Sequence, residues 1–131
     1  MVKTGHLLVV DDDPDITLMM KTMLEFKGFT VAVADQAGKA VEMLRGATID
    51  IVIMDMFLSG ISGVTICAGF KKDPATSHIP VIMMSAHPDA RKVCMDAGAD
   101  DFVSKPFDIQ DLLAKINGLI AGTATRPGSI N

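Results

Sequence analysis

Short apolar runs alternate with amphipathic segments from the beginning of the chain. Residues 7–10 are all apolar and are followed at once by Asp11, Asp12 and Asp13. A run too short for a helix that meets a polar loop is typical of a buried strand. Asp13 before Pro14 then predicts a helix start, with an acidic N-cap and a proline at the first helical position.

The same unit of strand and helix recurs to about residue 120. We expect further strands at 29–33, 49–54, 81–84 and 101–104, and further helices at about 37–46, 63–71, 89–97 and 109–120. Parallel strands need crossover connections, and these place helices on both faces of a sheet. The predicted fold class is therefore α/β, a doubly wound five-stranded parallel sheet with five helices.

The periodicity is lost after residue 121, where the segment GTATRPGSIN is rich in glycine, threonine, serine and proline. A chain of 131 residues is large enough for one core and too short for two. We expect one domain at 1–121 and a flexible tail or the start of a linker at 122–131.

Composition and charge narrow the class of protein. Hydrophobic residues make up 49% and charged residues 21% of the chain, as in folded globular domains. The net charge of −4 argues against nucleic-acid binding by this chain. There is no apolar run of the ~20 residues that span a bilayer and no signal-peptide pattern, so we expect a cytoplasmic protein without membrane insertion. Cys67 and Cys94 lack metal-type spacing and are expected to be reduced core thiols.

Polar residues follow four of the predicted strands. Asp11 and Asp12 follow the first, Asp55 the third, Ser85 the fourth and Lys105 the fifth. In open α/β sheets the carboxyl ends of the strands meet at one edge, where ligands bind. Carboxylates that converge there repel one another unless a cation lies among them, and Mg²⁺ suits oxygen ligands.

This set of residues suits phosphoryl transfer to a carboxylate. An acyl phosphate on Asp55 would gain negative charge that Mg²⁺ and Lys105 could neutralise, and the Ser85 hydroxyl could donate to a phosphoryl oxygen. Each residue alone has an ordinary structural reading, such as a cap, a turn or a strand end. Their occurrence together, after the right strands in order, favours a functional site.

Four segments carry a resemblance to a known family: LLVVDDDPDI, DIVIMDMFLSGISG, PVIMMSA and AGADDFVSKPF. With these the chain resembles the receiver domain of two-component response regulators, which has a CheY-like fold of the flavodoxin type, over about residues 6–121. The resemblance implies Mg²⁺-dependent phosphoryl transfer to Asp55 from a sensor histidine kinase or a histidine phosphotransfer protein. It implies a signalling domain and not an enzyme, one that catalyses only its own phosphorylation and dephosphorylation.

The resemblance also implies roles for individual residues. Asp11 and Asp12 would hold Mg²⁺ together with Asp55, and Phe57 would add its backbone carbonyl. Lys105 would face the phosphoryl group. It precedes Pro106 at a position where the family commonly has a cis peptide bond.

Two further positions would carry the signal onward. Ser85 would be the hydroxyl switch, and Phe102 lies where the family has an aromatic residue whose rotation reports phosphorylation. The phosphorylated surface would bind a downstream output protein or act on an output domain outside this chain.

Some positions near the site differ from the family or are open to two readings. Ser59 stands where the family usually has proline, which predicts a more mobile loop. Phe57 and His87 lie two residues beyond Asp55 and Ser85 and are expected to modulate hydrolysis. Phe57 either shields the acyl phosphate or packs on its loop, and His87 either orients water or is a solvated loop residue.

Three other functions are compatible with parts of the pattern. Asp11 and Asp13 could be the pair of an aspartyl phosphohydrolase, but Pro14 and Asp15 do not continue such a motif. A nucleotide binder of the same fold would need phosphate-cradling N–H groups, and the aspartates after the first strand would repel a phosphate. The third is an interaction-only receiver that is never phosphorylated.

Overall fold

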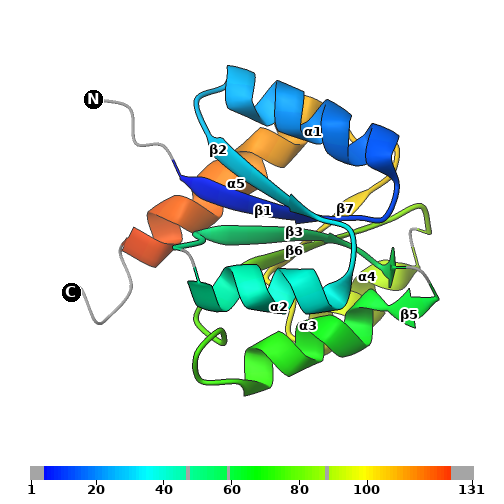
Figure 1. The fold of residues 1–131 in the computed structure, drawn as a ribbon. Coiled ribbons are helices and arrows are strands. Elements are labelled where there is room, and N and C mark those ends of the chain that lie inside the picture. The colour runs from blue at the N-terminus through cyan, green and yellow to red at the C-terminus, as the bar shows by residue number, and fades with distance from the viewer. Residues whose placement is uncertain (1–4, 47, 59, 88, 125–131) are drawn as a thin grey trace.

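A parallel sheet of five strands forms the centre of the computed structural model, which describes residues 5–46, 48–58, 60–87 and 89–124. The strand order is β2-β1-β3-β6-β7 (Figure 1). The strands are β1 (His6–Val10), β2 (Thr30–Ala34), β3 (Ile51–Asp55), β6 (Val81–Ser85) and β7 (Asp101–Ser104). All neighbouring pairs are parallel, which confirms the predicted sheet.

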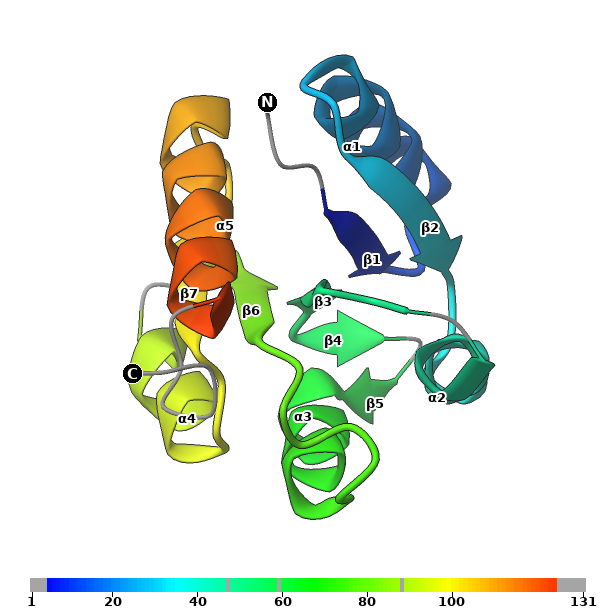
Figure 2. The ribbon, with the colours of Figure 1, turned by 90° about the vertical axis from the view of Figure 1, so that its left-hand side faces the viewer.

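Helices cover both faces of the sheet, as the strand pattern predicts. They are α1 (Pro14–Phe26), α2 (Ala37–Gly46), α3 (Gly63–Lys72), α4 (Ala90–Asp96) and α5 (Ile109–Ala124). Figure 2 shows α1 and α5 on one side and α2, α3 and α4 on the other. The fold is therefore doubly wound α/β.

Two apolar cores lie on the two faces of the sheet. Successive strand residues point to opposite faces, so Leu7 and Val9 enter the core beneath α1 and α5, while Leu8 and Val10 enter the other. The middle strands are buried on both sides, which explains why they consist of continuous apolar runs. This leaves polar residues to the strand ends, where the site is built.

The first helix begins and ends where its residue types predict. The Asp13 carboxylate accepts hydrogen bonds from the backbone N–H groups of Asp15, at 2.9 Å, and Ile16, at 3.4 Å. Pro14 is the first helical residue. Gly28 follows the helix with a φ of 100°, a conformation that glycine adopts without strain.

A small hairpin was not predicted. Strands β4 (Phe57–Leu58) and β5 (Ile61–Ser62) pair in antiparallel fashion between Asp55 and α3. Two-residue strands are too short to produce an alternating pattern, so the sequence reads as a loop there. The prediction that falls on Ser59 lies outside the described residues.

Some predicted element bounds were wrong. The second and third strands are Thr30–Ala34 and Ile51–Asp55, so Phe29 and Ile49 are buried outside the strands in which the apolar pattern placed them. Helix α5 continues to Ala124, into the segment 122–131 that was predicted as a tail. Within the described residues no helix is both long and apolar enough to cross a membrane.

Candidate functional site

The carboxyl edge of the sheet brings together Asp11, Asp55 and Lys105. Asp11 directly follows β1, Asp55 is the last residue of β3, and Lys105 directly follows β7. The Lys105 Nζ lies 2.6 Å from Oδ1 of Asp55 and 3.3 Å from Oδ2 of Asp11. Three residues separated by up to 94 positions therefore form one ion cluster, as their places after the strands predict.

Burial sets the protonation behaviour of this cluster. The side chain of Asp11 is 2% exposed, and burial raises the pKa of its carboxyl above 3.8, with a smaller contribution from the charge of Asp55. The N–H of Asp13 and the ammonium of Lys105 oppose this rise. Burial alone would lower the pKa of Lys105, but its hydrogen bond to Asp55 and the charge of Asp11 raise that pKa above 10.5. Lys105 is thus a firmly charged counter-ion for two acids.

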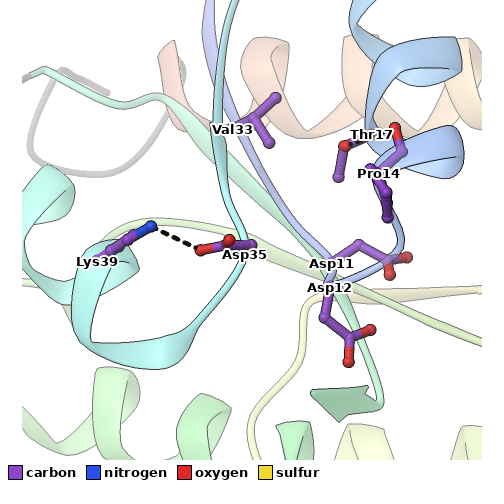
Figure 3. A pocket seen from close by; sticks show the side chains of 7 residues that line it. All are labelled: Asp11, Asp12, Pro14, Thr17, Val33, Asp35 and Lys39. Atoms are coloured by element: carbon purple, nitrogen blue, oxygen red, sulfur yellow. Dashed lines mark hydrogen bonds and ion pairs between the residues drawn. The ribbon is translucent and has the colours of Figure 1, made fainter. Parts of the chain in front are cut away.

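Asp12, the residue after Asp11, lines a cavity beside the cluster. In Figure 3 the carboxylates of Asp11 and Asp12 point in different directions from successive positions. The cavity measures about 380 Å³ and is lined by Asp11, Asp12, Pro14, Thr17, Val33, Asp35 and Lys39. The sequence interpretation missed Asp35 and Lys39, which form an ion pair of 3.0 Å in the cavity wall. Asp35 directly follows β2, so the rule that located the other site residues could have located it too.

The donor set at this edge suits Mg²⁺ in chemistry but does not form a closed cage. In the described part of the chain no three acidic, histidine or cysteine side chains are grouped so as to hold a metal ion. Mg²⁺ needs only one or two carboxylates, because it keeps several waters and binds phosphate oxygens. Asp11 and Asp55, which share the Lys105 ammonium, meet that smaller need.

The hairpin places Phe57 next to the Asp55 carboxylate. The backbone N–H of Phe57 donates to Oδ2 of Asp55 at 3.2 Å. The side chain of Phe57 is 55% exposed, so it is not packed away in the core. Its carbonyl as a metal ligand stays a prediction.

Ser85 and Phe102 lie on the neighbouring strands β6 and β7. Ser85 is buried, and its Oγ accepts a hydrogen bond from the backbone N–H of His87 at 3.0 Å. Accepting this bond leaves the hydroxyl proton able to donate. Phe102 is 4% exposed and belongs to the core beneath α2, α3 and α4, while the His87 residue is exposed.

The peptide bond between Lys105 and Pro106 is cis. The backbone N–H of Lys105 donates to the carbonyl of Ser85 at 2.8 Å. This bond continues the β6 and β7 pairing beyond the strands and ties the lysine to the serine. The two predicted site residues are therefore linked through the backbone.

Fold and site together define a class: a doubly wound α/β domain with a buried acid, a partly buried acid and a lysine at the carboxyl edge of its sheet. Residues 7–117 match the response regulator receiver domain family, and the chain belongs to this family. It is a receiver domain of the kind found in response regulators of two-component systems.

Individual relatives agree with this assignment. The chain is 32% identical over 95% of its length to the DNA-binding response regulator MtrA of Mycolicibacterium smegmatis, but covers only 54% of that protein. It therefore spans about half the length of the curated relatives it matches.

Two solved structures are similar over nearly their whole length. The signal receiver domain of a signal transduction histidine kinase from Syntrophus aciditrophicus has a TM-score of 0.84 and 29% identity, with 97% of each chain covered. The response regulator TrrA from Thermotoga maritima, in complex with Mg²⁺ and BeF, has a TM-score of 0.79 and 28% identity, covering 88% of this chain and 98% of that one.

Proposed function

We propose that this chain is a phosphoacceptor domain in which Asp55 accepts a phosphoryl group and thereby switches a partner-binding surface. The observation that carries the proposal is the ion cluster, in which Lys105 lies 2.6 Å from Asp55 and also contacts the buried Asp11. A fixed positive charge beside a carboxylate at the carboxyl edge of the sheet suits a group that gains negative charge.

The reaction is a transfer from a phosphohistidine to a carboxylate. An oxygen of Asp55 attacks phosphorus, the N–P bond breaks, and the imidazole nitrogen leaves with the electron pair and takes up a proton. The phosphoryl group is then held as an acyl phosphate. Lys105 would neutralise its oxygens, since its raised pKa keeps it charged throughout the physiological range.

Mg²⁺ is the cofactor of this proposal. Asp11 and Asp55 would hold it with the backbone carbonyl of Phe57. Asp12 would join them once its carboxylate turned toward the cluster (Figure 3), because the described residues contain no group of three such side chains already placed for a metal ion. When bound it supplies positive charge at the phosphoryl oxygens. Burial raises the pKa of Asp11 and so disfavours its ionised form. A further cation beside Asp11 would favour the ionised form, which supports a metal ion at this site.

Ser85 and Phe102 would pass the signal on. A phosphoryl oxygen on Asp55 offers an acceptor for the Ser85 hydroxyl, which now accepts only a backbone N–H from His87 among the contacts described. Movement of Ser85 would change the packing next to Phe102 on the adjacent strand. The surface near β7 would then differ between the two states.

The donor is proposed to be a histidine kinase or a histidine phosphotransfer protein. An apolar cavity of about 420 Å³ opens beside the lysine of the site and is lined by Ile16, Met19, Met23, Ala86, Lys105, Pro106 and Phe107. Met19, which lines this cavity on α1, is 41% exposed. An apolar surface that borders the phosphoacceptor cluster is suited to a protein donor.

The output would be a separate protein or a domain beyond this chain. MtrA is a DNA-binding response regulator, but this chain covers only 54% of it and carries a net charge of −4, so DNA contact by this chain is not part of the proposal. A cytoplasmic location is part of it, in keeping with two free, buried cysteines. The domain would catalyse only its own phosphorylation and dephosphorylation.

The phosphohydrolase alternative loses its second acid. The Asp13 carboxylate caps α1 and accepts two backbone hydrogen bonds, so it is committed to the helix start. A nucleotide binder is disfavoured by the acids that line the cavity after β1. The interaction-only receiver differs from the proposal in a single measurable property, the gain of a phosphoryl group.

Intact mass spectrometry tests the proposal. The protein is incubated with acetyl phosphate with and without Mg²⁺, beside Asp55→Asn. We expect one phosphoryl mass in the wild type with Mg²⁺ and none in Asp55→Asn. Absence of that mass in the wild type with donor and Mg²⁺ in excess contradicts the proposal.

A further inference from the structure

The first residue of α3 lies directly against the backbone of the phosphoacceptor. A Cβ atom added to Gly63 would overlap the carbonyl oxygen of Asp55 and would lie 2.9 Å from the carbonyl oxygen of Met56. It would also lie 3.0 Å from the Cα of Met56. These neighbours are backbone atoms, which cannot rotate away as the end of a side chain can.

Gly63 also holds this backbone by a hydrogen bond. Its N–H donates to the carbonyl of Met56 at 2.5 Å. The preceding residue, Ser62, pairs with Phe57 in the small hairpin and caps α3 by accepting from the N–H of Val64 at 3.2 Å. The start of α3 is therefore in direct contact with, and hydrogen-bonded to, the backbone between Asp55 and Phe57.

The requirement at Gly63 is for space and not for an unusual backbone angle. The described glycines with positive φ are Gly28, Gly60 and Gly98. Gly60, in the same hairpin, has a φ of 82° and open space around its Cβ position. These two glycines lie only three residues apart but serve different purposes. Gly60 allows the turn of the hairpin, and Gly63 allows the close approach of α3.

We infer that Gly63 is a positioning residue for the phosphoacceptor site. Because it has no side chain, α3 can sit on the Asp55 and Met56 backbone and fix both the Asp55 carboxylate and the Phe57 carbonyl. The inference rests on the proposed function, since that function requires these two groups to meet one metal ion. Any side chain at position 63 would push them out of place.

The test compares two alanine substitutions in the same helix. Gly63→Ala forces the acceptor backbone to move, whereas Gly69→Ala adds a Cβ with no heavy atom within 4 Å. We expect Gly63→Ala to weaken Mg²⁺ binding, measured by amide NMR titration, by about tenfold, the order of loss seen when a residue that orients a metal ligand is changed. Gly69→Ala should bind Mg²⁺ as the wild type does.

The metal-free protein gives a second measurement. Amide shifts at Asp55–Leu58 should differ from those of the wild type in Gly63→Ala and not in Gly69→Ala. A folded Gly63→Ala with wild-type amide shifts at these residues and a wild-type Mg²⁺ affinity overturns the inference. A wild type that neither binds Mg²⁺ nor gains a phosphoryl group overturns the proposed function instead, whatever Gly63→Ala does.

Ser62→Ala decides the matter if Gly63→Ala does not fold. It adds no atoms but removes the cap on Val64, so it loosens the start of α3. Weaker Mg²⁺ binding by Ser62→Ala, with shifted Asp55 and Phe57 amides in the metal-free protein, supports the inference. Unchanged binding and unchanged amides overturn it.

Discussion

Lys105 has two acidic partners, and this determines what its removal would do. In the metal-free protein it neutralises the buried Asp11 and the partly buried Asp55. On phosphorylation its charge would be needed at the phosphoryl oxygens. The same side chain would therefore serve stability in one state and chemistry in the other.

Lys105→Met should separate these two roles. Without Mg²⁺ we expect a loss of roughly 1–3 kcal/mol in the free energy of unfolding, because Asp11 is left buried without its counter-ion. Mg²⁺ should stabilise this variant more than it stabilises the wild type, by binding the same carboxylates. Phosphoryl transfer at saturating Mg²⁺ should fall by about a hundredfold. Chemical denaturation with and without Mg²⁺ measures the stability of each protein, and mass spectrometry measures the rate of phosphoryl transfer. Equal stabilisation of the wild type and Lys105→Met by Mg²⁺ would contradict the account.

Phe57 should govern how long the acyl phosphate survives. Its side chain is 55% exposed beside Asp55, where it can restrict the approach of water. We expect Phe57→Asn to hydrolyse its phosphoryl group several-fold faster. Ile61→Asn is the matched control, since Ile61 is 51% exposed on the same hairpin. A time course of the phosphorylated mass measures both, and equal lifetimes for wild type and Phe57→Asn would remove the shielding role.

The site residues that could be predicted from the sequence are those whose position follows from their place directly after a strand. We could predict that Asp11, Asp55 and Lys105 lie close together, because each comes at the carboxyl end of a strand in a parallel sheet. Gly63 could not, since a close approach of α3 to the acceptor backbone is a property of packing that leaves no periodic mark. Whether Asp12 takes part in the cluster depends on the direction of its side chain, and the sequence does not predict that direction.

Helix α1 carries an apolar surface that its own core does not use. Met20 and Leu24 are buried beneath it, while Leu18, Met19 and Phe26 are exposed. Met19 lines the cavity that reaches Lys105. One helix thus serves the fold with one face and borders the phosphoacceptor site with the other.

Met19→Asp tests whether this face receives a protein donor. We expect it to slow phosphoryl transfer from a phosphorylated histidine kinase or phosphotransfer protein at least tenfold, because a charge enters an apolar contact surface. Transfer from acetyl phosphate should be unchanged. Val93→Asp, on α4 at a residue that is 48% exposed, is the control and should leave both rates unchanged. Equal losses with both donors in Met19→Asp would point to damage at the site instead.

Long elements were predictable, and short ones were not. The amphipathic pattern of α5 gave its start at Ile109, while its last residues, beyond the final apolar position, were read as a tail. The hairpin of β4 and β5 was missed because pairing of two residues with two others depends on the turn between them. Its position next to Asp55 makes this the omission with the greatest consequence for the site.

The whole molecule buries two thiols in the core beneath α2, α3 and α4. Burial raises the pKa of Cys67 to about 11, from an ordinary value of 9.0. The folded state therefore holds its thiol proton at a pH where the unfolded chain has lost it. The stabilisation linked to this proton is fully present below pH 9 and is lost between about pH 9 and pH 11.

Denaturation at several alkaline pH values checks this linkage. The free energy of unfolding of the wild type should fall more steeply between pH 9 and pH 11 than that of Cys67→Ala, which has no thiol to titrate. The difference should reach on the order of 2 kcal/mol at pH 11. Far-ultraviolet circular dichroism is the signal, because the chain has neither tryptophan nor tyrosine. Parallel pH profiles for the two proteins would contradict the prediction.

The architecture was predictable as a whole because one rule repeats. Each strand of the parallel sheet contains a short apolar run, and a helix comes before the next strand of that sheet. A parallel sheet with helices on both faces satisfies that repeat. The partner and the output were not predictable in the same way. They depend on surface chemistry, which the hydrophobic pattern does not encode. The chain spans about half the length of the curated relatives it matches.

An amide NMR fingerprint with Mg²⁺ and beryllofluoride, a mimic of the phosphoryl group, tests the central claim most directly. The account predicts that the amides of Asp55, Ser85 and Phe102 shift together in the wild type and stay in place in Asp55→Asn. No shift in the wild type with both reagents in excess would contradict it, and the interaction-only receiver would then be the better description of this domain.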